Sequence, residues 1–114
     1  MQVLRLATLL GPDRPETHFN LGIAYQRLVM LSDAEQEVLL SLQIDPNQVD
    51  GRNTLGTIYA EEGKYSRAQD TWNELVEADP NYAPARQNLV ILQQVERGEI
   101  KGSENISNGL AHEP

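Results

Sequence analysis

The chain has no cysteine among its 114 residues. Without thiols it can form no disulfide, carry out no thiol redox chemistry and hold no cysteine-ligated zinc. This composition fits a reducing compartment, and we therefore expect a cytoplasmic protein.

Long apolar segments are also lacking. No apolar run approaches the ~20 residues that a membrane-spanning helix needs. Residues 1–10 are apolar but short, Arg5 interrupts them, and no small-residue cleavage site follows. We therefore expect neither a signal peptide nor insertion into a membrane.

Positive charge is scarce. The 9 lysines and arginines face 17 acidic residues, which gives a formal net charge of -8. Nucleic-acid-binding proteins normally show a basic stripe, and this sequence has none, so we expect no nucleic-acid partner. The acidic balance by itself predicts solubility and some attraction to basic partners.

Residues that carry enzyme chemistry are few and scattered. The two histidines are His18, at a packing position, and His112, which has no positioned partner. They form no metal-ligand cluster and no serine triad, and Gly22 and Gly56 lie inside predicted helices rather than in a phosphate-binding loop. We predict no catalytic residue, no metal site and no cofactor, and hence a protein that is not an enzyme.

What the sequence does contain is an internal repeat. Identical residues recur 34 positions apart at Gly22 and Gly56, Tyr25 and Tyr59, Ala34 and Ala68, and Pro46 and Pro80, and Leu21, Leu55 and Leu89 keep the same step. A period of this length is typical of stacked helical repeats. It predicts an all-α scaffold that presents a surface.

Two full repeat units can be laid out, residues 15–48 and 49–82, each with two helices joined by a tight turn. In the first unit we predict helices over about 15–29 and from Ser32 onward, where Ser32 and Glu35 form a capping box. In the second we predict helices over about 48–61 and 65–78, with Gly63 between them. Each unit closes with Asp-Pro-Asn, since proline cannot continue a helix interior.

The ends of the chain fit incomplete units. Residues 1–14 are predicted to be the second helix of a truncated repeat, because Pro12 lies 34 residues before Pro46. A capping helix is predicted over 83–98, with Asn81 as its N-cap and Gly98 as its stop. Residues 99–114 are rich in Gly, Ser, Asn and Glu and are predicted to be a disordered tail.

These positions resemble the tetratricopeptide repeat family over about residues 1–97. The first unit supplies His18, Leu21, Gly22, Tyr25, Ala34, Val38 and Pro46, and the second supplies Arg52, Leu55, Gly56, Tyr59, Ala68, Trp72 and Pro80. His18 and Arg52 stand where the family usually has tryptophan. The resemblance implies a right-handed superhelical stack of antiparallel helix pairs, an α-solenoid.

The residue sizes suit such packing. Gly22 and Gly56 would let the paired helix approach where a side chain would clash, and a glycine inside a helix costs roughly 1 kcal/mol against alanine. Ala34 and Ala68 would provide the facing small surface. The larger residues Tyr25, Tyr59, Val38 and Trp72 would fill the space between helix pairs.

The leading helix of each unit should line a concave groove, the side on which such stacks usually bind partners. Helical spacing places ten residues on that stripe: Asn20, Ile23, Arg27, Asn53, Thr54, Thr57, Glu61, Gln87, Asn88 and Ile91. Their amides could bond an extended peptide or accept a helix from a protein partner of unknown identity. The alternative is that they are merely solvated helix faces.

The N-terminal residues suggest a second function. A helix over 1–10 would be apolar on more than one side, through Val3, Leu4, Leu6, Leu9 and Leu10. One side would pack on the first full repeat, and the side meant for the missing leading helix would be exposed. We predict that two copies pair as a homodimer through these residues, or that the chain belongs to a longer repeat array. The alternative is a frayed helix in a monomer.

Overall fold

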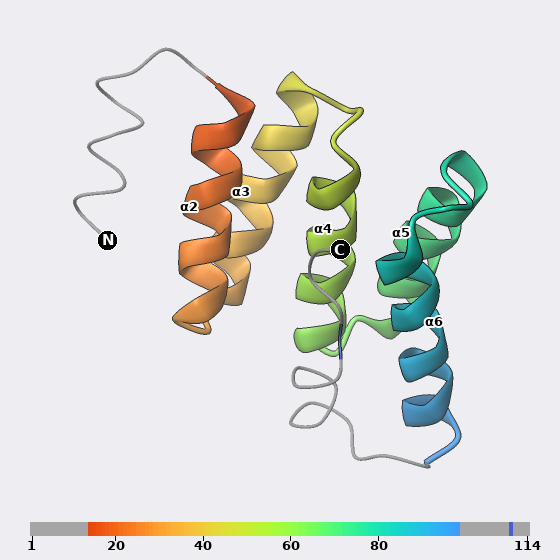
Figure 1. Cartoon of the computed structure of the whole chain (residues 1–114). Helices are drawn as coiled ribbons and strands as arrows, with labels where there is room; N and C mark the ends of the chain where they lie inside the picture. The colour runs from red at the N-terminus through yellow and green to blue at the C-terminus, as the bar shows by residue number, and fades with distance from the viewer. Residues whose placement is uncertain (1–13, 99–109, 111–114) are drawn as a thin grey trace. The chain divides into compact units, whose positions relative to one another are not determined.

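The structure is a computed structural model that describes residues 14–98 and Leu110. It contains five helices in these residues: α2 (Pro15–Arg27), α3 (Leu31–Ile44), α4 (Val49–Glu61), α5 (Tyr65–Ala78) and α6 (Ala83–Glu96) (Figure 1). No strand occurs in the described part, which confirms the all-α prediction. The predicted truncated-repeat helix lies outside the described residues, as does the predicted tail except for Leu110.

The chain divides into two compact units, residues 1–51 and 52–114, called unit 1 and unit 2 below. Unit 1 contains α2, α3 and the first turn of α4, and unit 2 contains the rest of α4 with α5 and α6. Unit 2 also contains Leu110, whose side chain is 6% exposed.

In unit 1, α2 and α3 pack side by side (Figure 1). Leu21 and Tyr25 of α2 and Ala34 and Val38 of α3 are buried in the contact. A Cβ atom built on Gly22 would lie 2.6 Å from Val38 Cγ2 and 3.3 Å from the carbonyl oxygen of Ala34. The predicted close approach of the helices at Gly22 is therefore confirmed.

The end of α3 is held by hydrogen bonds to its last carbonyl groups. The Gln48 side-chain amide donates to the carbonyl oxygens of Ser41 at 2.9 Å and Asp45 at 3.1 Å. The buried Ser41 hydroxyl donates to the carbonyl oxygen of Pro15 at 2.7 Å, which ties this end of α3 to the start of α2. The helix ends before Pro46, which has no backbone N–H, and the bonds from Gln48 add partners for its last carbonyl groups.

In unit 2, the indole ring of Trp72 packs over Gly56. A Cβ atom on Gly56 would lie 2.6 Å from Trp72 Cε2 and 2.7 Å from Cδ1. The indole N–H donates to the carbonyl oxygen of Asn53 at 3.3 Å, so the ring is oriented as well as enclosed. Leu75 of α5 and Leu92 of α6, both buried, extend this core, and α5 and α6 pack side by side (Figure 1).

The helix bounds match the predicted ones closely, but both predicted N-caps are wrong. The helix α3 begins at Leu31 with Met30 as its N-cap and no side-chain cap bond, so Ser32 lies inside the first turn. Likewise α6 has Tyr82 rather than Asn81 as its N-cap. At α3 the reason is the turn before it, where the Met30 N–H bonds the carbonyl oxygen of Tyr25 at 2.9 Å and leads directly into the helix.

That turn contains a strained residue. Val29 has φ +59°, in the left-handed region that side chains with a branched Cβ rarely adopt. Its equivalent one repeat later is Gly63, with φ +81°, for which the same conformation is easy. The fold therefore uses the same turn geometry twice, and unit 1 accepts strain where unit 2 has none.

We expect Val29→Gly to raise the free energy of unfolding of unit 1 by about 1 kcal/mol. A left-handed residue with a Cβ costs roughly 1–2 kcal/mol, and part of the gain from removing this strain is offset because glycine loses more chain entropy on folding. Urea denaturation followed by circular dichroism measures the change. The matched control is Gly63→Val, which should destabilise unit 2 by a similar amount. An unchanged unfolding midpoint for Val29→Gly would show that the turn is not strained.

Candidate functional site

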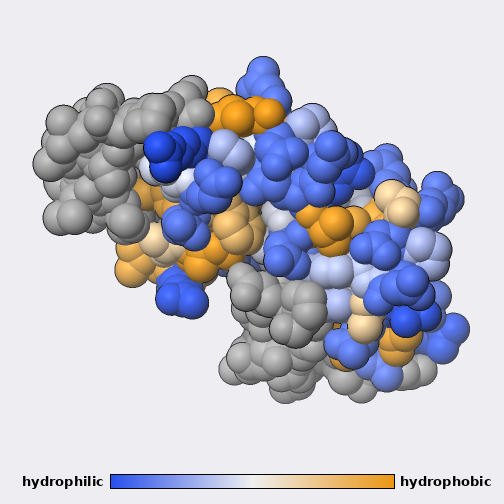
Figure 2. Space-filling view, turned by 45° about the horizontal axis from the view of Figure 1, so that its top comes forward, coloured by the Kyte–Doolittle hydropathy of each residue, from blue (hydrophilic) through white to orange (hydrophobic). Residues whose placement is uncertain are grey.

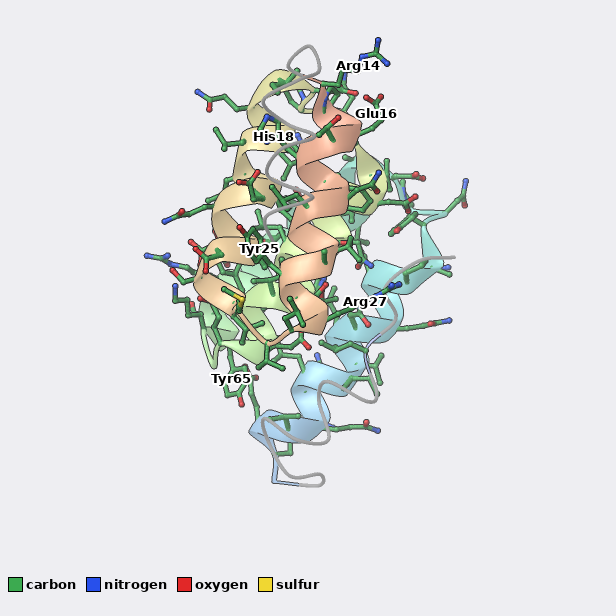
Figure 3. The ribbon with its side chains drawn as sticks, turned by 90° about the vertical axis from the view of Figure 1, so that its left-hand side faces the viewer. Arg14, Glu16, His18, Tyr25, Arg27 and Tyr65 are labelled. Atoms are coloured by element: carbon green, nitrogen blue, oxygen red, sulfur yellow. The ribbon has the colours of Figure 1, made fainter. Side chains whose placement is uncertain are left out.

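In unit 1, the predicted groove residues lie on one side of α2. Asn20 and Arg27 are exposed, and Ile23 is half-buried between them. Figure 3 shows Arg27 on the opposite side of α2 from His18 and Tyr25. The structure therefore presents these three predicted residues as a polar stripe with one apolar position.

His18, one of the two histidines considered in the sequence analysis, lies on the opposite side of α2. His18 Nδ1 lies 2.8 Å from Glu37 Oε2, which joins α2 to α3 (Figure 3). Both side chains are largely buried. This contact supports a structural role for His18, and it makes Glu37 part of the contact between the two helices.

In unit 2, the structure requires a correction. The prediction treats Asn53, Thr54, Thr57 and Asn88 as open groove surface, but all four side chains are fully buried. The reason is that the polar sides of α4 and α6 meet each other, since the Asn88 side-chain amide donates to Asn53 Oδ1 at 3.0 Å. The remaining predicted residues are more accessible, with Gln87 exposed and Glu61 and Ile91 half-buried.

The buried polar residues form a small hydrogen-bonded cluster. The Thr57 hydroxyl donates to the carbonyl oxygen of Thr54 at 2.7 Å. The Thr54 hydroxyl, in contrast, is buried and makes no hydrogen bond. Leaving a buried polar group without a partner costs roughly 1–3 kcal/mol. A valine of the same shape would avoid this cost, so stability does not explain the hydroxyl.

The sequence pattern did not single out the turn between α2 and α3 or the outer face of α3. Leu28, Val29 and Met30 are exposed in the turn, and Leu39 and Leu40 are exposed on α3. A signal was available, because the residues 34 positions later are Glu62, Gly63 and Lys64 in the turn and Asn73 and Glu74 on α5. Equivalent positions that change from polar to apolar are candidates for contact surfaces.

Within residues 14–98, no group of three or more His, Cys, Asp or Glu side chains could hold a metal ion. The helices in the same part of the chain are all too short or too polar to cross a membrane.

Comparison with protein-family models finds none that matches this chain, and comparison with curated proteins finds no significant match.

Proposed function

We propose that this chain is a non-catalytic protein-interaction module of the tetratricopeptide type, which holds a peptide or a helix of another protein against its leading helices. The 34-residue period, the helix pairs and the close contacts at Gly22 and Gly56 support the family assignment. On this proposal α2 acts in unit 1, and α4 and α6 act in unit 2.

The observation that carries the proposal is the Thr54 hydroxyl. It is buried and makes no hydrogen bond, yet it lies next in sequence to Asn53, whose side chain accepts a bond from Asn88. A peptide main chain offers a carbonyl oxygen and an N–H at every residue, and so it can satisfy a hydroxyl that the folded chain leaves without a partner. Binding then requires a local opening of unit 2 that lets the peptide reach Thr54.

The exposed residues of α2 suit the same kind of ligand. Asn20 can donate to and accept from a main chain, and Arg27 can bind a carboxylate or a carbonyl oxygen. Ile23, half-buried between them, offers a small apolar contact. A peptide with an acidic residue and an apolar residue would fit this stripe.

The test uses Thr54→Val. We expect this change to raise the free energy of unfolding of unit 2 by about 1 kcal/mol, because a buried unbonded hydroxyl becomes a methyl group. We also expect it to weaken binding about tenfold, the effect of losing one buried hydrogen bond to a ligand. Binding is measured by fluorescence anisotropy with a labelled peptide selected on the full chain from a library of short linear peptides.

The matched control is Thr57→Val on the same helix. The Thr57 hydroxyl is already bonded within the chain, so its loss should lower stability rather than raise it. If Thr54→Val binds the selected peptide as tightly as the unmodified chain, the hydroxyl is not part of a binding site. If no library peptide binds at all, the groove function itself fails.

The alternative function, self-assembly through Val3, Leu4, Leu6, Leu9 and Leu10, stays a prediction, because these residues lie outside the described part of the chain.

A further inference from the structure

The large apolar side chains that are exposed are distributed unevenly. Among the described residues they lie in unit 1, at Leu28, Val29, Met30, Leu39, Leu40 and Ile44, with Val90 as the exception in unit 2. In the face shown by Figure 2, hydrophobic surface is visible over unit 1, and hydrophilic side chains cover most of α5 and α6. Exposed apolar patches on a protein surface mark contacts.

One part of this surface is a projection. The turn between α2 and α3 exposes Leu28 by 56%, Val29 by 74% and Met30 by 41%. The carbonyl oxygens of Leu28 and Val29 accept no hydrogen bond within the described residues. We call these three residues the apolar turn.

The other part is a shallow hollow on the outer face of α3, widely open to solvent. It has a volume of about 370 Å³, and its described lining consists of Gln36, Leu39, Leu40 and Gln43. Leu39 and Leu40 are 40% and 42% exposed. The side-chain amides of Gln36 and Gln43 are exposed at its two ends and make no hydrogen bond within the described residues.

The fold does not require either feature. The residues of unit 2 that are equivalent to the apolar turn are Glu62, Gly63 and Lys64, and those equivalent to the lining of the hollow are Asp70, Asn73, Glu74 and Glu77. Both helix pairs form with such different surfaces, and α5 keeps the same length as α3. Unit 1 even accepts a valine with φ +59° where a glycine would be unstrained.

We infer that the apolar turn of one copy of this chain inserts into the α3 hollow of a second copy. Apolar side chains meet apolar side chains in this contact, and the amides of Gln36 and Gln43 can donate to the open carbonyl oxygens of Leu28 and Val29. The turn cannot fill the hollow of its own chain. Met30 and Leu40 are ten residues apart, roughly 15 Å along one rigid helix.

Charge favours a second copy as the occupant. The chain has a net charge of -8, so two copies repel each other over most of their surfaces. The apolar turn and the described lining of the hollow contain no acidic residue. At these surfaces two copies can approach each other without repulsion between acidic side chains.

The contact joins two different surfaces, so it does not close on itself as a symmetric dimer does, and it leaves a free turn at one end and a free hollow at the other. A contact of three side chains is also well below the size of a stable dimer interface. The association is therefore weak and grows with concentration. This self-contact is independent of the proposed peptide binding.

The first test compares the unmodified full chain with two variants that carry residues of unit 2. One variant replaces the apolar turn, as Leu28→Glu, Val29→Gly and Met30→Lys, and the other replaces the hollow, as Leu39→Asn and Leu40→Glu. By sedimentation across a concentration series, the unmodified chain should form dimers and longer species. Each variant alone should associate at least about tenfold more weakly, since each loses buried apolar contacts.

An equimolar mixture of the two variants is decisive. One variant keeps an intact hollow and the other an intact turn, so the mixture should form pairs that do not grow further. A mixture that stays monomeric while the unmodified chain associates would overturn the inference. So would variants that associate as strongly as the unmodified chain, because residues 1–10 or another surface would then hold the copies. An unmodified chain that stays monomeric would leave the turn to a different partner and would overturn it too.

A second measurement does not depend on the folding of multiple substitutions. Because the chain has no cysteine, Val29→Cys and Leu40→Cys each introduce a unique thiol. In an equimolar mixture of the two variants, oxidised glutathione takes up the electrons of the two thiols and is reduced. The disulfide that joins one variant to the other should then form in a larger proportion than random collision gives. If disulfides between two copies of the same variant form as often as disulfides between the two variants, the turn does not lie in the hollow.

Discussion

Gly56→Ala should lower the free energy of unfolding of unit 2 by about 2–3 kcal/mol, the upper range for forcing an extra methyl group into a packed core. The added Cβ would lie 2.6 Å from Trp72 Cε2 and 2.7 Å from Cδ1. The indole ring has no room to move away, since Trp72 is fully buried and its N–H is bonded to the carbonyl oxygen of Asn53. The helices α4 and α5 would have to separate.

The sign of this change is informative because helix propensity acts the other way. In an open helix, replacing glycine by alanine stabilises by about 1 kcal/mol. The third position of the series is Val90, which is exposed on α6. Val90→Ala should therefore change stability by less than about 0.5 kcal/mol, and it serves as the control.

Trp72 is the single tryptophan of the chain, so its fluorescence reports on unit 2 while circular dichroism reports on both units. Urea titration of Gly56→Ala should move the fluorescence transition to lower urea. Trp72→Phe, with a smaller ring, should cost less in the Gly56→Ala background than in the unmodified chain, because the clash is with the indole. A stabilising effect of Gly56→Ala would mean that the two helices do not approach closely at this residue.

The packing at Gly56 and Gly22 could be predicted from sequence because a glycine in a helix is unfavourable locally, and its recurrence at one offset implies a neighbour. The stops at Gly63 and Gly98 could be predicted for the same kind of reason, since both adopt positive φ. Local chemistry dictates these features, and a period of 34 residues repeats them.

The caps and the polar faces could not be predicted in this way. Ser32 fits a capping box, but the backbone bonds of the preceding turn make Met30 the N-cap of α3. Asn53 and Asn88 have the spacing of exposed groove residues. Helical spacing shows which residues share one side of a helix, but it does not show which element packs against that side. The bond between them joins α4 to α6 across 35 residues of chain, so tertiary packing alone decides their burial.

Asn88→Ala should lower the free energy of unfolding of unit 2 by about 2 kcal/mol, because it removes a buried donor and leaves Asn53 Oδ1 without it. Urea titration by Trp72 fluorescence measures the loss. The control is Gln87→Ala, the exposed neighbour on the same helix, which should stay within about 0.5 kcal/mol of the unmodified chain.

A double-mutant cycle with Asn53→Ala separates the bond between the two amides from their other contacts. The double variant should be more stable than the sum of the single losses predicts, by about 1 kcal/mol, because each single change leaves the other amide buried and only the double change removes both. Additive losses would show that the two amides do not act as a pair.

A cost in stability of this size also decides how binding is tested, since Asn53→Ala or Asn88→Ala would weaken the binding of a ligand by destabilising unit 2. Thr54→Val is expected to stabilise the same unit, and a loss of binding in that variant can be assigned to the hydroxyl.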